Sequence, residues 1–286
     1  MAGVGVFSKR AKVGSYALAY VGAADCYVLL GAEFYGRGTT LTRDEAFERA
    51  RAAAQEALRR DATLAEAQAT LGLLRFRDDW DWLEAERFLR RAIAMRPDYV
   101  PARHWYSDFL AAMGRSDQAI LATKAVELDP ASPLQNSQLG VRFLQGHLYD
   151  EAIEHLKEAL RLDPNFPRAR ERLAMSYWLD GATVEAVESA RRAPTPLGEF
   201  YELLSKGMQA EAVRVVATMS EHEWPGGLRA SYHALAGDRV GALDVLDRAF
   251  RERHPLLPNA LAFPPLDPLR TEPRLMEILR RMNLSS

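Results

Sequence analysis

The sequence has very little cysteine. Cys26 is the single cysteine among 286 residues. An internal disulfide bond is therefore excluded, and so is a metal cluster held by several thiolates. This content suits a reducing compartment, and Cys26 is expected to pack as a small apolar residue.

An excess of positive charge is also missing. The chain has 37 lysines and arginines against 39 aspartates and glutamates, a formal net charge of −2 and a pI of about 6.3. Proteins that bind phosphate backbones without sequence preference need a strong positive field. No direct nucleic acid binding is therefore expected.

Long hydrophobic runs are missing as well. The longest one near the N-terminus, residues 13–24, ends at Asp25 and is too short to span a bilayer. Lys9, Arg10 and Lys12 precede it as in a signal peptide, but Asp25 interrupts the apolar region. We expect a cytoplasmic chain without a membrane span, and export stays open as an alternative.

Motifs of catalysis are missing too. The sequence has no G-x-S-x-G elbow and no phosphate-binding glycine loop, and its six histidines include no pair four residues apart. Trp80 and Trp82 are interpreted as packing residues near a turn between helices. We expect no catalytic residue, no cofactor and no metal site, and therefore no enzyme.

A repeated phrase is what the sequence does contain. It occurs as ALRRDATLAEA from Ala57, AIAMRPDYVPA from Ala92, AVELDPASPLQ from Ala125 and ALRLDPNFPRA from Ala159. The leading alanines are 35, 33 and 34 residues apart. This period is typical of helix–turn–helix units that stack on one another, so the sequence predicts an all-α solenoid.

The clearest copy spans residues 133–166. Its apolar, small and helix-ending residues are Leu139, Gly140, Phe143, Ala152, Leu156, Ala159 and Pro164. This pattern resembles the tetratricopeptide repeat (TPR). Gly140 and Ala152 lack bulk and should let the two helices approach closely, while Pro164 should end the second helix.

The phasing of the repeat suggests four segments. We expect an irregular segment at 1–14, a regular TPR array at 15–194, degenerate TPR-like helical pairs at 195–254, and a Pro-rich segment with a C-terminal capping helix at 255–286. The Pro-rich part, HPLLPNALAFPPLDPL, should be irregular and extended. Thr271 is the expected N-cap of the capping helix, whose apolar face would carry Leu275, Ile278, Leu279 and Met282.

Residues 78–120, with SYALAYVGAADCYVLLG and LDPLRTEPRLMEILRRMNL, carry a closer resemblance. They are similar to the TPR region of bacterial winged-helix transcriptional regulators, adenylate cyclases and serine/threonine kinases. The resemblance implies an interaction or sensing module, although residues 1–14 contain no effector domain.

Two functions follow from this resemblance. The first is a non-catalytic scaffold that binds a peptide or helix in the concave TPR groove, in bacterial signalling or transcriptional regulation. The alternative is the sensory or ligand-binding half of a regulator whose effector domain is missing from this chain. The oligomeric state stays open.

The first helix of each repeat should present its groove positions away from the second helix. The partner-binding residues that we predict on this basis are His104, Asp108, Gln138, Gln145, Arg168, Arg172, Met175 and Trp178. Together they form a mixed polar and apolar surface of the kind that accepts an extended peptide or a helix.

Arg168 and Arg172 are four residues apart and could together receive a carboxylate or a phosphate. The competing interpretation is an ordinary solvated or glutamate-paired helix face. TPR domains that grip chaperone C-termini use Lys, Asn and Arg at positions that are here Leu134, Ser137, Gln138 and Val141. This difference argues against a carboxylate clamp of that kind.

Overall fold

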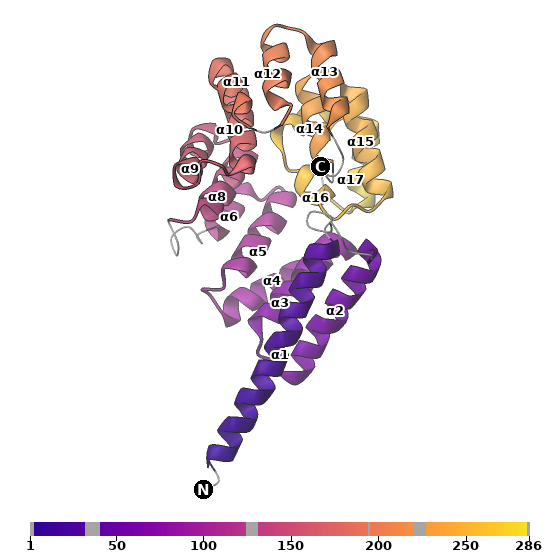
Figure 1. Ribbon diagram of the computed structural model, residues 1–286. Coiled ribbons are helices and arrows are strands. Elements are labelled where there is room, and N and C mark those ends of the chain that lie inside the picture. Colours follow the sequence, from indigo (N-terminus) through magenta and orange to yellow (C-terminus); the bar gives the residue numbers. More distant parts are fainter. Residues whose placement is uncertain (1–2, 32–40, 124–130, 194, 220–226, 285–286) are drawn as a thin grey trace. The chain divides into compact units, whose positions relative to one another are not determined.

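A computed structural model describes residues 3–31, 41–123, 131–193, 195–219 and 227–284 (Figure 1). Helices form all the regular structure of these residues, and no strand occurs within these ranges. The chain divides into two compact units, residues 1–106 and 107–286. Each unit is built from successive helical hairpins, which is the all-α TPR solenoid that the sequence predicts.

The first unit contains two helical hairpins and the start of a further helix. Its elements are α1 (Gly3–Gly31), α2 (Arg43–Arg60), α3 (Ala65–Leu74), the π-helix η1 (Arg75–Asp79), α4 (Trp82–Met95) and the beginning of α5 (Val100–Ala112). α1 packs along α2, and α3 packs along α4.

Helix α1 differs from the expectation in two ways. It begins at Gly3, so the prediction of an irregular segment at 1–14 is wrong for the backbone of residues 3–14. No proline occurs in this stretch to stop the helix. Cys26 is exposed rather than packed, because the buried face of α1 is formed by other residues. These are Ala17, Val21, Ala24 and Val28.

The π-helix η1 accommodates one extra residue in the second repeat. Ala57 and Ala92 are 35 residues apart, one more than the regular spacing. A π-helix widens one turn by one residue and so absorbs an insertion without breaking the helix. Trp80 follows with a left-handed φ of 55°, and the Trp82 ring packs edge-on against Phe76 with centroids 6.1 Å apart.

The second unit continues the hairpins. Its elements are α6 (Ser116–Ala122), α8 (Pro133–Gln145), α9 (Tyr149–Leu162), α10 (Pro167–Asp180), α11 (Thr183–Arg191), α12 (Leu197–Ser205), α13 (Gln209–Thr218), α14 (Leu228–Leu235), α15 (Arg239–Arg251), α16 (Leu257–Ala260), the 3₁₀-helix η2 (Pro264–Leu269) and α17 (Pro273–Arg281). One hydrophobic core runs from α8 to η2 and includes Leu156, Tyr201 and Phe263.

Glycine allows the two helices of a hairpin to touch. A Cβ added to Gly140 of α8 would lie 2.7 Å from Leu156 Cγ and 3.2 Å from the backbone oxygen of Ala152. A Cβ at Gly72 of α3 would lie 2.7 Å from Leu89 Cγ of α4. Both glycines hold the same place in their repeats, and neither leaves room for a side chain.

The second helices end where the sequence predicts. α9 ends with Asp163 as its C-cap, directly before Pro164, and α4 ends with Arg96 directly before Pro97. Proline has no N–H to donate and disfavours helical geometry in the preceding residue. The third copy of this signal, at Pro130, lies outside the described residues.

The C-terminal part differs in detail from the expectation. α17 buries its predicted apolar face of Leu275, Ile278, Leu279 and Met282 and packs on α15. Its N-cap is Glu272 rather than Thr271, because Pro273 is preorganised for the first helical position. The Pro-rich segment before it is not extended, since it forms α16 and η2.

Replacing Gly140 by alanine should destabilise the second unit. The added Cβ must displace Leu156 or separate α8 from α9, and overpacking of this kind lowers the free energy of unfolding by about 1–3 kcal/mol. Gly22 of α1 is the control. Beyond the backbone of its own helix and its chain neighbours, no atom lies within 4 Å of the point that a Cβ would occupy there, and alanine should add about 1 kcal/mol of helix propensity. Urea denaturation of G140A and G22A measures both, and equal stabilities would contradict the close approach.

Asp25 is a partly buried acid of the first unit. Its Oδ1 accepts a hydrogen bond from Thr70 Oγ1 of α3 at 2.8 Å. Burial raises the pKa of the Asp25 carboxyl above 3.8, nearby Glu66 raises it further, and the Thr70 hydrogen bond opposes them. The net shift is upward, so folding favours the protonated acid.

Asp25→Asn should therefore stabilise the protein at pH 7. A raised folded-state pKa gives stability that is present below the unfolded pKa of 3.8 and is lost as the pH rises through the folded pKa. Asparagine still accepts the Thr70 hydrogen bond and carries no charge. The melting temperature of D25N should exceed that of the parent at pH 7 and approach it below pH 4. Asp98→Asn, which removes an exposed carboxylate, is the control. A D25N variant less stable at pH 7 would contradict this assignment.

Candidate functional site

The predicted partner-binding residues are distributed over both units. His104 lies in the first unit on α5 and is half-buried. The other seven lie in the second unit, with Asp108 on α5, Gln138 and Gln145 on α8, and Arg168, Arg172, Met175 and Trp178 on α10. We call the side of α8 and α10 that carries these six residues the groove face.

Asp108 is engaged inside the protein. Its Oδ1 accepts a hydrogen bond from Arg142 Nη2 at 2.7 Å, and the side chains of Asp108 and Arg142 are only 6% and 4% exposed. Removing one partner of a buried ion pair leaves the other charge uncompensated and destabilises the fold. Asp108 therefore joins α5 to α8, and the expectation that it lines an open groove is corrected.

The chain's own C-terminal segment covers part of the groove face. We call residues 254–270, which include α16 and η2, the C-terminal strap. The ring of Phe263 lies 4.4 Å from the Arg172 guanidinium carbon, and Phe263 and Ala260 join the same hydrophobic core as Met175. The strap is therefore a built-in occupant of the surface that the sequence predicts for a partner.

Polar contacts fix the strap at its far end. Asp267 Oδ2 lies 3.1 Å from His147 Nε2 in the turn between α8 and α9. Burial and the Asp267 charge both raise the pKa of the Tyr149 hydroxyl, which lies 3.1 Å from His147 Nδ1. Arg270 donates from Nε to Asp267 and from Nη2 to the backbone oxygen of Leu261, each at 2.9 Å, and so braces the strap internally.

This packing leaves three predicted residues unavailable to a partner. Met175 has no exposed surface, and Arg172 and Gln145 are each 6% exposed. At these positions the structure has buried side chains rather than an open surface, and Phe263 of the strap lies on Arg172. The signal for the strap was present in the sequence, since HPLLPNALAFPPLDPL is too apolar for an exposed linker.

Two tyrosines lie buried behind the groove face. Tyr201 of α12 and Tyr232 of α14 have no exposed surface, and burial raises the pKa of both hydroxyls well above the ordinary value. The charges of Arg172 and Glu171 act on both tyrosines, with opposite effects. Both phenols stay neutral at physiological pH, so they are part of the core rather than acid–base groups.

Three predicted residues of the second unit keep accessible surface. Gln138 and Arg168 are half-buried, and so is Trp178, whose ring lies 5.4 Å from that of Tyr201. Arg168 and Arg172 cannot receive one anion together as predicted, because Phe263 covers Arg172. Arg168, Gln138 and Trp178 therefore keep accessible surface on the groove face.

The described part of the chain has neither a cluster of metal-binding side chains nor a membrane-spanning helix. It contains no group of three or more histidine, cysteine, aspartate or glutamate side chains placed to hold a metal ion. Within the same residues, no helix combines the length and the apolar character needed to cross a bilayer.

The comparisons with known proteins agree on one type of repeat. The model of the TPR repeat family matches residues 143–181, which include α9 and α10. The small glutamine-rich tetratricopeptide repeat-containing protein 2 of Mycosarcoma maydis is 32% identical over 99 residues, or 35% of this chain. The matched stretch spans only 28% of the length of that relative.

Solved structures share the fold. A tetratricopeptide repeat protein from Parabacteroides merdae has a TM-score of 0.55 at 13% identity, over 84% of this chain and 99% of that one. The type IV pilus biogenesis factor PilW has a TM-score of 0.51 at 16% identity, over 90% and 98%. The period, the helical hairpins and the comparisons all agree that the chain contains TPR repeats and has the all-α TPR fold.

Proposed function

We propose that this protein is a non-catalytic cytoplasmic scaffold that binds a segment of another protein, in bacterial signalling or transcriptional regulation. TPR proteins are generally protein–protein interaction scaffolds, and their relatives are typically non-catalytic. The observation that carries the proposal is that the groove face already holds a Pro-rich segment with two short helices, the C-terminal strap.

The strap illustrates which interactions this surface can make. An aromatic ring lies against an arginine, and a carboxylate lies against a histidine. Prolines keep the segment from forming a longer helix, which lowers the conformational entropy lost on binding. A partner segment with aromatic and acidic residues could use the same types of contact on the surface beside the strap.

The accessible part of the groove face supplies the proposed binding residues. Trp178 offers an apolar edge, and aromatic residues are enriched among the side chains that dominate binding energy. Arg168 can add a charge-assisted hydrogen bond and Gln138 a neutral one. These three residues belong to two neighbouring helices, α8 and α10, so one extended segment could reach all of them.

The regulatory context rests on the resemblance of residues 78–120 to the TPR region of bacterial regulators. If the chain acts as the sensory half of such a regulator, the bound segment would belong to an effector domain. If it acts as an adaptor, the segment would belong to a separate protein. The identity of the captured partner distinguishes the two.

Replacing the three accessible residues should abolish capture of the partner. We expect the triple variant Gln138→Ala, Arg168→Ala and Trp178→Leu to lose the protein that the parent retains from a bacterial lysate, as identified by mass spectrometry. The control combines Gln118→Ala, Leu148→Ala and Arg161→Ala, which lie outside the groove face. Circular dichroism confirms that both variants stay helical. Equal capture by parent and triple variant would rule out this surface.

Arg172 should act on stability rather than on capture. Its guanidinium is buried against the Phe263 ring, a contact that contributes about 2 kcal/mol when desolvated. Arg172→Ala and Phe263→Leu should each lower the free energy of unfolding, and the double variant should show a coupling of about 1 kcal/mol. Urea denaturation of the four proteins measures this coupling, and strictly additive losses would contradict the contact.

A further inference from the structure

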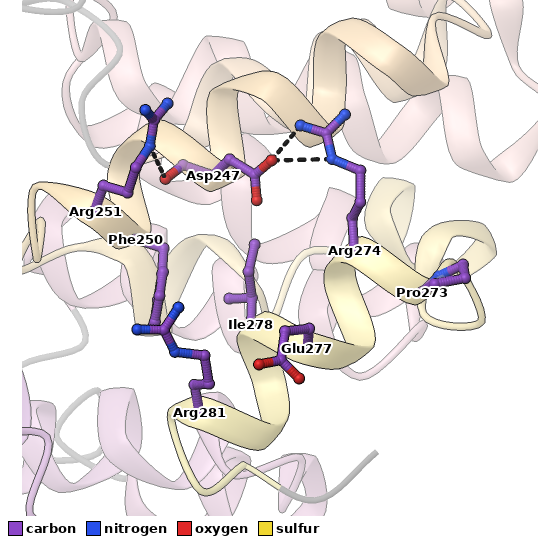
Figure 2. A pocket seen from close by; sticks show the side chains of 8 residues that line it. All are labelled: Asp247, Phe250, Arg251, Pro273, Arg274, Glu277, Ile278 and Arg281. Atoms are coloured by element: carbon purple, nitrogen blue, oxygen red, sulfur yellow. Dashed lines mark hydrogen bonds and ion pairs between the residues drawn. The ribbon is translucent and has the colours of Figure 1, made fainter.

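A second surface of the second unit carries an open hollow. It lies between α15 and α17 and has a volume of about 500 Å³. Figure 2 shows its lining, in which Ile278 points between the two helices, Arg281 lies below Phe250, and Arg274 reaches Asp247. No residue of this hollow belongs to the groove face or to the C-terminal strap.

The floor of the hollow is apolar. Ile278 of α17 is 3% exposed, and Phe250 of α15 is half-buried beside it. Pro273, at the start of α17, adds an exposed apolar wall. A floor of this kind accepts one large apolar side chain, which would gain stability by leaving water.

Both acidic residues of the lining are already paired with arginines. Arg274 Nε donates to Asp247 Oδ2 at 2.9 Å, and Arg274 Nη2 donates to Asp244 Oδ1 at 2.8 Å. Glu277 is paired with Arg280, from whose Nη2 it accepts a hydrogen bond at 2.7 Å. These carboxylates therefore do not repel an approaching anion with their full charge.

Two further arginines, Arg251 and Arg281, lie at the other end of the lining. Arg251 Nε donates to the backbone oxygen of Asp247 at 3.3 Å, and the Arg281 guanidinium lies 4.8 Å from the Phe250 ring centre. Within the described part of the chain, neither arginine has an ion pair with a carboxylate. Both side chains are exposed and both flank Phe250.

We propose that this hollow docks an acidic segment of a partner protein. One large apolar side chain of that segment fills the space over Phe250 and Ile278, and neighbouring carboxylates bind the planar forks of Arg251 and Arg281. The charge of the lining carries this assignment, because its three arginines outnumber its two carboxylates and because Arg251 and Arg281 border the apolar floor. The inference rests on the proposed function only in that the partner is a protein.

Fluorescence anisotropy with labelled decapeptides tests the proposal on the full-length protein. The probe is a peptide of aspartates and glutamates with one central phenylalanine. Two further peptides replace the phenylalanine by alanine or every acid by its amide. We expect the probe to bind, and each altered peptide to bind at least about tenfold more weakly.

Variants of the chain locate the binding. The double variant Arg251→Ala with Arg281→Ala should lower the affinity for the probe by about tenfold for each arginine, since each substitution removes a charge-assisted hydrogen bond. The matched control, Arg214→Ala with Arg248→Ala, removes the same charge from exposed positions outside the hollow and should change the affinity less than about twofold. Circular dichroism checks that both proteins are folded.

Several results would overturn the proposal. The proposal is wrong if the probe does not bind to the parent protein, or if the amide peptide binds as tightly as the probe. It is also wrong if both double variants lose the same amount of affinity for the probe. A dimer in light scattering that dissociates in the Arg251/Arg281 variant would also overturn it, because the occupant would then be a second copy. Capture of a protein from lysate through Gln138, Arg168 and Trp178 does not depend on this hollow. The two experiments therefore test the proposed function and the present inference independently.

Discussion

The close approach of the two helices in each repeat is the constraint on which the rest of the structure depends. Gly140 against Leu156 and Gly72 against Leu89 show the same contact in two repeats. A side chain at either glycine would separate the helices and change the angle at which the next hairpin stacks. The positions of all groove residues follow from that stacking, so small residues control a surface that they do not touch.

The C-terminal strap changes what this solenoid can offer to a partner. A TPR array is expected to leave one face open, but here Phe263 lies on Arg172 and the surrounding positions are buried. The chain itself therefore occupies part of the surface that the sequence predicts for a partner. Of the predicted residues on α8 and α10, Gln138, Arg168 and Trp178 keep accessible surface.

Sequence alone was enough for features that are set by neighbouring residues. The period, the glycine contact and the helix ends at Pro97 and Pro164 all follow from local pattern and sterics. The strap was not predicted, because its burial depends on pairing with helices much earlier in the chain. Asp108 was misread for the same reason: its partner Arg142 belongs to another repeat, and periodicity carries no information about such pairs.

The strap also affects when the second unit can fold during synthesis of the chain. In an ordinary solenoid each hairpin contacts only its neighbours, so folding can advance along the chain as it is synthesised. Here the side chains of Arg172 and His147 meet their partners only after the strap has left the ribosome. Contacts so distant in sequence slow folding and couple early and late hairpins into one cooperative step. The second unit should thus reach its native state as a whole, once the strap itself has been synthesised.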